Sequence, residues 1–323
     1  MNKKTVIMLI VASCLILIGC ILFIGVMSMS DWNFSKLSTS KYVTNHHEIK
    51  ESYTDIEIIT DCSDIVFVSS EEGSPTLVTC YETENMKHTV SVTEDTLRVH
   101  ISDTRKWYEH IGINFEDPKI TVAIPAGLYG KLSISSTTGR IDLPADFSFG
   151  SIDITGSTGD VINKASSKGS IKIKISTGDI TLENITARSL DLSVSTGKIT
   201  TENVDCSESI TLKTSTGSTV LKNTLCQSIV SKGTTGDITL KNTVANDYME
   251  IKRSTGDVKL DLSDSKEIFI STDTGTVTGT LLTGKVFTVK SSTGKIDVPT
   301  KNVLGGSCVV STDTGDIRIK IKE

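Results

Sequence analysis

The sequence predicts an all-β protein, a parallel β-helix or β-solenoid of about ten coils of 19–20 residues, with a transmembrane helix at its amino terminus. Three observations support this fold class. The dipeptide Thr-Gly occurs thirteen times, and ten of these copies lie at a nearly constant spacing. Apolar residues recur at fixed distances from each of these ten glycines, and a long uncharged segment lies near the amino terminus. Self-similarity at a short fixed period is typical of stacked structural units.

Residues 1–29 are predicted to be a membrane anchor. From Val6 to Met27 there are 22 residues without a charge, preceded by Lys3 and Lys4. That length spans the apolar core of a bilayer, and the flanking lysines indicate an amino terminus in the cytoplasm. We therefore expect a single-pass protein of the cell membrane whose C-terminal domain is extracellular.

Two other interpretations of this segment stay open. Residues 17–20, Leu-Ile-Gly-Cys, resemble the motif of bacterial lipoproteins, in which Cys20 would be lipidated, although residues 21–27 remain apolar after it. A cleaved signal peptide is the second, but its apolar core is usually about 7 to 15 residues long. An uncleaved anchor agrees best with the length of the run.

Two irregular segments separate the anchor from the repeats. Residues 30–52 begin with the interfacial Trp32 and continue as a polar stretch, which we interpret as a stalk. Residues 53–130 contain strand-like alternating runs, such as 56–59 and 97–101, without a Thr-Gly dipeptide. They are interpreted either as irregular early coils or as a small β region that caps the solenoid.

Residues 131–323 carry the repeats. Every residue seven positions before a repeat glycine is apolar, nine of the ten residues five positions before it are large and apolar, and the residues between are mainly polar. This alternation indicates a strand with one buried face, and a second alternating run follows each glycine. The glycines lie 19 to 21 residues apart, at positions 139, 159, 178, 197, 217, 236, 256, 275, 294 and 315.

Each repeat is too short to contain a crossover helix, because that connection alone needs about a dozen residues. It suits one coil of a solenoid in which every strand pairs in parallel with its copy in the next coil. Glycine at the corner accepts a positive φ, and an asparagine column is expected to form a stacked left-handed turn. That column comprises Asn184, Asn203, Asn223 and Asn242. The last strand, 317–321, alternates isoleucine with cations and is expected to close the end of the rod.

Five cysteines lie beyond the anchor, so at least one has no intramolecular disulfide partner. Cys206 and Cys226 each follow their glycine by nine residues, which places them on adjacent coils within disulfide range. The same column contains Ala187 and Ala245, so a tight site that accepts only small residues is the alternative. A disulfide between Cys206 and Cys226 is therefore one of two interpretations.

The segment 107–115 concentrates the aromatic residues of the part beyond the anchor, including Trp107, Tyr108 and Phe115. Such a loop could bind a partner through its aromatic side chains. Packing over the open end of the solenoid explains it equally well.

The repeated Ser-Thr-Gly-Asp-Ile unit, clearest at 176–180, resembles a known family. Together with the anchor and the β segment that ends at 124–128, it is similar to the bacterial putative-adhesin β-strand-repeat family, a domain of unknown function in Gram-positive cell envelopes. The resemblance covers nearly the whole chain beyond the anchor. It implies a right-handed β-helical solenoid, and it supplies no ligand-binding motif.

Composition argues against several function classes. Without Lys3 and Lys4 the chain has 31 basic residues, from 33, against 39 acidic ones, a net charge of −8. It has no basic stripe and few aromatic residues, so nucleic acid is not an expected partner. No phosphate-binding loop, dinucleotide fingerprint or zinc pattern is present, and the five histidines have no ligand constellation at a known spacing. We expect neither a cofactor nor a metal site.

An enzyme is also not expected. Aspartates follow the repeat glycines, and adjacent carboxylates can share a proton, as in glycan-active β-helix enzymes. The same column also contains Arg140 and Lys198, as a solvated turn would, and no catalytic partner recurs beside the acids. The aspartates are Asp160, Asp179, Asp237, Asp257 and Asp316.

The preferred hypothesis is a membrane-anchored surface protein, an adhesin or envelope-binding module. Its Ser/Thr-rich face would bind a cell-wall polymer or an envelope protein through many weak contacts. The alternative is an envelope-stress sensor or regulatory partner of a membrane protein that acts through the aromatic loop. A glycan-active enzyme is a distant third.

Overall fold

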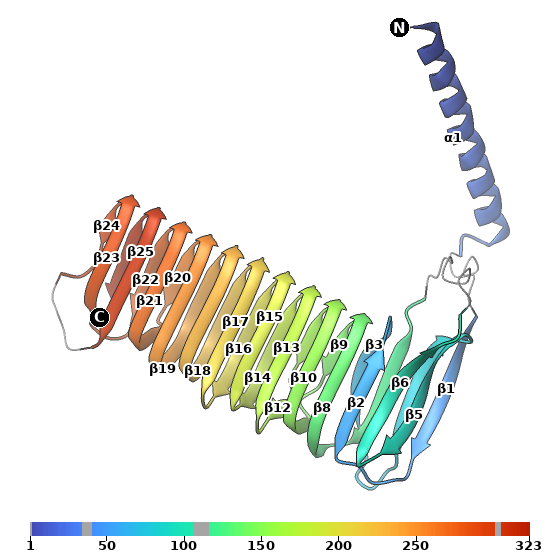
Figure 1. Ribbon diagram of the computed structural model, residues 1–323, viewed down its shortest axis with the longest axis horizontal. Coiled ribbons are helices and arrows are strands. Elements are labelled where there is room, and N and C mark those ends of the chain that lie inside the picture. Colours follow the sequence, from blue (N-terminus) through green and yellow to red (C-terminus); the bar gives the residue numbers. More distant parts are fainter. Residues whose placement is uncertain (1, 34–40, 106–115, 301–304) are drawn as a thin grey trace.

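The protein is one apolar helix followed by a rod of β-strands (Figure 1). The computed structural model describes residues 2–33, 41–105, 116–300 and 305–323. Helix α1 (Lys3–Met29) has 27 residues, and the apolar window that identifies it as a candidate membrane span is not buried against the rest of the chain. It is long and apolar enough to cross a membrane.

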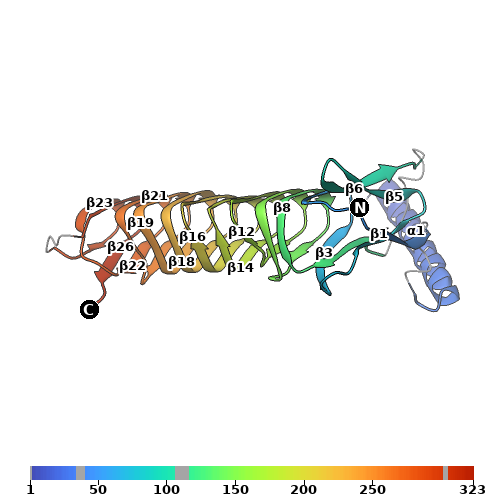
Figure 2. The same cartoon turned by 90° about the horizontal axis from the view of Figure 1, so that it is seen from below.

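The solenoid consists of strands that stack in parallel along the rod, as Figures 1 and 2 show. Its strands are β2 (Asp55–Thr60), β3 (Asp64–Ser70), β8 (Gly127–Thr138), β9 (Ile141–Leu143), β10 (Phe147–Thr158), β11 (Val161–Asn163), β12 (Ser166–Ser167), β13 (Ser170–Thr177), β14 (Ile180–Ala187), β15 (Ser189–Thr196), β16 (Ile199–Cys206), β17 (Ser209–Thr216), β18 (Thr219–Thr235), β19 (Ile238–Thr255), β20 (Val258–Asp261), β21 (Asp264–Thr274), β22 (Val277–Leu281), β23 (Val286–Thr293), β24 (Ile296–Asp297), β25 (Ser307–Thr314) and β26 (Ile317–Ile321).

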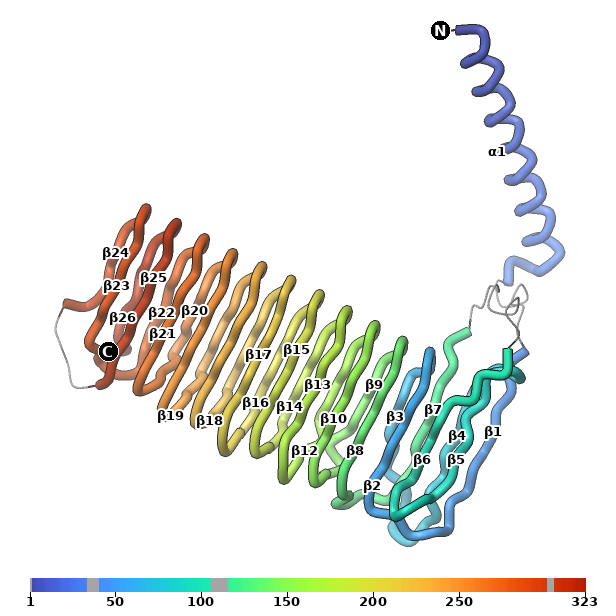
Figure 3. The backbone as a smooth tube through the Cα atoms, viewed as in Figure 1, coloured from blue at the N-terminus to red at the C-terminus, as the bar shows by residue number. Residues whose placement is uncertain are grey.

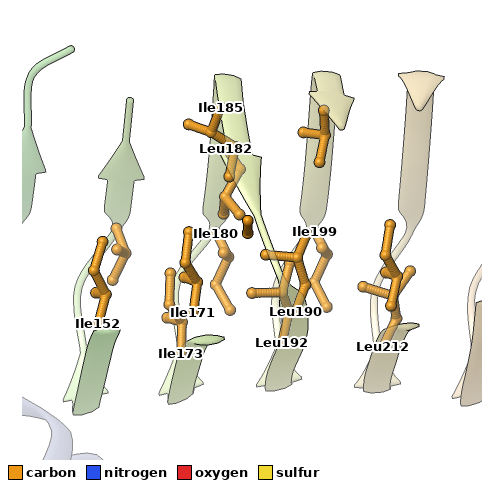
Figure 4. Close-up of a cluster of buried hydrophobic side chains, with 14 of the residues drawn as sticks. Ile152, Ile171, Ile173, Ile180, Leu182, Ile185, Leu190, Leu192, Ile199 and Leu212 are labelled. Carbon is orange, nitrogen blue, oxygen red and sulfur yellow. The ribbon is translucent and has the colours of Figure 1, made fainter. Parts of the chain in front are cut away.

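The predicted apolar columns form the core. Ile152 pairs with Ile171, Ile171 with Leu190, and Leu190 with Ile210, each on the next coil. All four side chains are buried, and Figure 4 shows the stacked apolar side chains of this part of the rod. The β-solenoid fold predicted from the repeat is therefore confirmed.

Ser231, the polar exception five residues before a glycine, and Thr219, two residues after a glycine, both face one buried arginine. The Arg253 guanidinium donates to Ser231 Oγ at 3.0 Å and to Thr219 Oγ1 at 3.3 Å. Burial lowers the pKa of Arg253 to about 10, so the side chain remains charged at neutral pH. The apolar pattern is interrupted where these hydroxyls are needed to satisfy a buried cation.

The asparagine column forms the stacked left-handed turn that the sequence predicts. Asn184, Asn203, Asn223 and Asn242 have φ values between 48° and 55°. The side-chain amide of each of the last three donates to Oδ1 of the preceding asparagine, at 2.8 Å for Asn203 and Asn223 and 3.1 Å for Asn242. This ladder stabilises the return turn of four successive coils.

Residues 53–130 contain two kinds of strand. β2 pairs in parallel with β8 and β3 with β9, so these two strands form a coil without a Thr-Gly dipeptide. The remaining described strands of this region are β4 (Thr76–Thr83), β5 (Met86–Thr93), β6 (Thr96–Asp103) and β7 (Lys119–Pro125). Together with β1 (Tyr42–Ile49) they are here called the N-terminal cap. β1 lies in the segment 30–52 that was predicted to be a stalk, and this prediction is wrong for residues 42–49 because they pair with β4. The strands of the cap pair largely antiparallel and cover the end of that coil through β6 and β7.

The last coils stack out of sequence order. β25 lies between β21 and β23, and β26 lies between β22 and β24, as the tube in Figure 3 shows. The expectation that 317–321 closes the rod is therefore wrong, because Ile317 and Ile319 are buried between two coils. The rod ends with β23 and β24, on which Val286 and Ile296 are 48% and 45% exposed.

A buried ion pair lies where the chain leaves and re-enters this stack. The Lys285 ammonium is 2.8 Å from Asp264 Oδ1 and donates to the Gly305 carbonyl oxygen at 2.7 Å. The lysine side chain is only 1% exposed. Through these two contacts, Lys285, just before β23, is connected both to Asp264 at the start of β21 and to Gly305, just before β25.

Candidate functional site

A continuous strip of hydroxyl groups follows one edge of the rod. The residue directly before each repeat glycine is threonine, and the residue before that is serine or threonine in eight of the ten repeats. Both positions are exposed in every repeat. We call these two rows the hydroxyl edge. The row two positions before the glycines comprises Thr137, Ser157, Ser176, Ser195, Ser215, Thr234, Ser254 and Ser292, together with Asp273 and Asp313.

A lysine column lies beside the hydroxyl edge on the same outward face, four residues before the glycines. Lys213 pairs with Lys232, and Lys232 pairs with Lys252, on three consecutive coils. Adjacent strands are about 4.8 Å apart, so three ammonium groups line up at close spacing. Every other member of this column is lysine, serine or threonine, namely Ser135, Thr155, Lys174, Ser193, Ser271, Ser311 and Lys290.

On the strands that follow the glycines, two lysines are paired with glutamates of the adjacent coil. Lys222 lies 3.5 Å from Glu202, and Lys164 lies 3.0 Å from Glu183. Within the described part of the chain, Lys213 and Lys232 belong to no ion pair, whereas Lys252 pairs with Glu250. Lys241 and Lys259, on the strands after the glycines, likewise belong to no ion pair among the described residues. The lysine column is therefore distinguished by three lysines stacked on consecutive coils, not by a lack of counter-charges.

The aspartates that follow the repeat glycines have a structural role. Asp160 Oδ1 accepts the backbone N–H of Asp179 at 2.8 Å, and Asp179 Oδ1 accepts that of Lys198 at 2.7 Å. Asp237, Asp257 and Asp316 make the same contact to a neighbouring coil. One acceptor per carboxylate is thus used to bind the backbone, which explains the column without catalysis.

The two cysteines of the predicted disulfide lie on adjacent coils, one step apart, and both are free thiols in the structure. Cys206 Sγ donates to the Arg188 carbonyl oxygen at 3.2 Å, and Cys226 Sγ donates to that of Val244 at 3.8 Å. Burial raises the pKa of Cys226 to about 12. The stacking required for a disulfide is present, and its formation stays a prediction.

The aromatic loop lies outside the described residues. Trp107, Tyr108 and Phe115 belong to the segment 106–115, so their predicted role in partner binding is not addressed by the structure.

A buried polar cluster in the N-terminal cap was missed in the sequence. Cys80 and Glu82 point inward from β4, and His88 points inward from β5 across the short hairpin. One ligand atom from each residue lies within 4.8 Å of the other two. The only sequence signal is the alternation Cys80-x-Glu82, which places two polar side chains on the buried face of one strand.

Several contacts hold this cluster together. Glu82 Oε2 lies 2.7 Å from both the backbone nitrogen and Nδ1 of His88, and Glu82 Oε1 accepts Asn45 Nδ2 at 2.6 Å. His88 Nε2 lies 2.9 Å from Thr60 Oγ1. Burial lowers the pKa of His88, outweighing the opposite effect of the Glu82 carboxylate, and burial raises the pKa of Cys80 to about 12.

Comparison with known proteins agrees with the solenoid fold. The sequence model of the family Toastrack DUF4097 matches residues 53–269 and 206–323, two ranges that overlap, as repeats allow. No curated protein matches the sequence.

Solved structures resemble the chain at low sequence identity. A putative adhesin of Bacteroides fragilis NCTC 9343 has 17% identity and a TM-score of 0.44, with 86% of this chain and 97% of that chain covered. A putative lipid binding protein of Parabacteroides distasonis ATCC 8503 has 12% identity and a TM-score of 0.47, with 88% and 98% covered. A putative adhesin of Parabacteroides merdae ATCC 43184 has 12% identity and a TM-score of 0.43, with 88% and 98% covered.

The resemblance noted from the repeat units is confirmed by the family match, which extends over most of the chain beyond the apolar helix. The protein belongs to the Toastrack DUF4097 family.

Proposed function

We propose that this protein is a membrane-anchored, extracellular binding rod that holds an anionic polymer of the cell envelope along its repeated face. Helix α1 would anchor the chain, with Lys3 and Lys4 on the cytoplasmic side. The observation that supports this function best is the lysine column beside the hydroxyl edge.

The lysine column and the hydroxyl edge together are chemically complementary to a polyol phosphate or an acidic glycan. Lysine ammonium groups bind phosphate or carboxylate groups as point charges. Serine and threonine hydroxyls donate to and accept from polymer hydroxyls. Because both rows repeat about every 4.8 Å, a chain lying along the rod would make many weak contacts at once.

The test measures binding of the full-length protein in detergent micelles to a poly(glycerol phosphate) chain, with an uncharged glucan of similar length as the reference polymer. The triple variant Lys213→Gln, Lys232→Gln, Lys252→Gln removes the lysine column. If each lysine contributes about 0.5 kcal/mol, affinity falls about tenfold at low salt, and the remaining binding depends less on salt.

The matched control removes three lysines from the other surface, as Lys222→Gln, Lys241→Gln, Lys259→Gln. Both triple variants change the net charge equally, so a difference in affinity between them shows that the position of the lysines on the rod matters. We expect the control to lose less than about twofold in affinity. Equal losses in the two variants, or equal binding of the uncharged glucan by the unmodified protein, would contradict the proposal.

A further inference from the structure

We propose that Cys80, Glu82 and His88 form a binding site for a divalent transition metal ion inside the N-terminal cap, with zinc as the expected occupant. Thiolate, imidazole and carboxylate together are a donor set typical of zinc. Calcium and magnesium prefer oxygen ligands, so a site containing a cysteine and a histidine does not suit them.

The positions of the ligand atoms fit this donor set. Tetrahedral zinc with bonds of about 2.0 to 2.3 Å places its ligand atoms about 3.3 to 3.8 Å apart. The three atoms here already lie within 4.8 Å of one another, and His88 Nδ1 is 2.7 Å from Glu82 Oε2. Binding of one ion would require the distance between His88 Nδ1 and Glu82 Oε2 to lengthen from 2.7 Å to about 3.3 Å, through rotation of these side chains.

Outer contacts orient two of the three ligands. Asn45 Nδ2 donates to Glu82 Oε1, which leaves Oε2 facing the histidine. Thr60 Oγ1 lies 2.9 Å from His88 Nε2 and can accept its proton when Nδ1 binds the metal. Such contacts to the far atoms of metal ligands fix the orientation of the ligands and their tautomer.

The charge of the cluster also favours a cation. Glu82 is 1% exposed, and within the described part of the chain its ion-pair partner is His88, not a lysine or an arginine. His47 Nε2, on the neighbouring strand β1, is buried and has no hydrogen-bond partner among the described residues, so this region holds an unsatisfied nitrogen as well. A buried carboxylate is costly without a compensating charge, and a divalent ion would supply one.

A fourth position is available beside the cluster. A cavity of about 40 Å³ is lined by Glu82 and His88, but not by Cys80, together with Cys62 and Arg105, among others. The Arg105 charge is paired with Asp103. The cavity has room for one water molecule, which commonly completes the coordination of zinc held by three side chains.

The experiment uses untagged full-length protein in detergent, freed of metal by a chelator and titrated with Co²⁺ as a spectroscopic probe. A thiolate bound to cobalt gives an intense charge-transfer band in the near ultraviolet, and tetrahedral cobalt absorbs strongly in the visible. We expect one equivalent per chain, with Zn²⁺ abolishing both signals by displacement. Cys80→Ser should abolish the charge-transfer band, and Glu82→Gln should weaken binding by at least about tenfold.

Cys226→Ser is the matched control, because Cys226 is an equally buried thiol in the solenoid. Its cobalt spectrum should equal that of the unmodified protein. A second measurement does not depend on the folding of variants: Zn²⁺ should slow alkylation of Cys80 in the unmodified protein and leave Cys226 unaffected, as read by mass spectrometry.

Three outcomes would overturn the site. They are absence of a cobalt band together with unprotected Cys80 in the unmodified protein, a band that survives Cys80→Ser, and a band that Cys226→Ser removes as fully as Cys80→Ser. The first of these would leave Glu82 and His88 as a purely structural hydrogen-bonded pair.

Discussion

Polar side chains behave differently in the solenoid and in the N-terminal cap. In the solenoid, Asn203 bonds to Asn184 on one side and to Asn223 on the other, so a polar group meets copies of itself. In the cap, Glu82 contacts Asn45 and His88, which come from two other strands. The first arrangement repeats one contact, and the second gathers different groups.

The difference follows from symmetry. A coil displaced by one strand spacing puts each side chain beside its counterpart, so the repeats generate rows of one chemical kind. Rows of hydroxyls and lysines suit a long repetitive partner, whereas a metal ion needs unlike ligands around one point. The regular part of this molecule is therefore suited to extended binding, and the irregular part to a localised site.

The largest expected change in stability comes from a substitution at a glycine corner, and it tests whether successive coils are in contact there. Gly217 has φ 134°, and a Cβ there would lie 1.9 Å from the carbonyl oxygen of Gly197. Gly217→Ala should therefore destabilise the fold by more than about 2 kcal/mol, measured as a loss in thermal unfolding temperature by circular dichroism.

Gly156→Ala in the same rod is the control for this substitution. Its nearest neighbour would be Ile175 Cγ2 at 3.2 Å, and its φ is not positive. We expect a cost of about 1 kcal/mol or less. Equal unfolding temperatures for the two variants would mean that the corner is not closely stacked.

An intermediate effect separates the two contributions of the asparagine column. Asn203→Ala loses two side-chain hydrogen bonds and places alanine at φ 54°, which together should cost about 2 kcal/mol. Asn203→Gly loses the same hydrogen bonds but tolerates the positive φ, so it should cost about 1 kcal/mol. Urea unfolding midpoints measure both, and identical midpoints would argue against a conformational contribution.

The smallest effect concerns opening of the two regions rather than overall stability. Burial raises the pKa of Cys80 and of Cys226 to about 12, so neither thiol reacts at pH 8 unless its surroundings open. Cys226 has coils on both sides, whereas Cys80 lies in the cap at one end. In metal-free protein we expect iodoacetamide to modify Cys80 about fivefold faster, corresponding to about 1 kcal/mol in opening free energy.

Faster modification of Cys226 than of Cys80 would reverse this comparison between the regions. The same labelling also tests the predicted disulfide. Protection of both Cys206 and Cys226 that disappears on reduction would establish a bond between them, and equal labelling with and without reductant would rule it out in the purified protein.

Much of the coil could be predicted because its determinants are local in each repeat. The alternation around Ile171 and Ile173, the glycine corner and the asparagine turn all depend on residues within one repeat and its immediate copies. The stacking order of the last three coils could not be predicted. Near-identical coils offer near-identical edges, so the pattern does not distinguish a stack in which β25 follows β21 from one in which β23 does.

The candidate sites differ in the same way. The hydroxyl edge follows from the Ser-Thr-Gly unit, and its exposure could be deduced from strand alternation. The lysine column could have been found by aligning the residues four positions before each glycine, although an overall negative charge argued against a basic stripe. The cluster of Cys80, Glu82 and His88 depends on how a hairpin folds back inside the cap, and no regular spacing indicates it.

The sequence by itself determined the cross-section of the rod, because short-range alternation and backbone preference at glycine and asparagine act within some twenty residues. Only the tertiary structure decided which coil ends the rod and which polar groups meet inside the cap. Those outcomes depend on contacts between segments more than one repeat apart, such as Ser311 with Ser271 and Glu82 with Asn45, whose energies are not encoded in any local pattern.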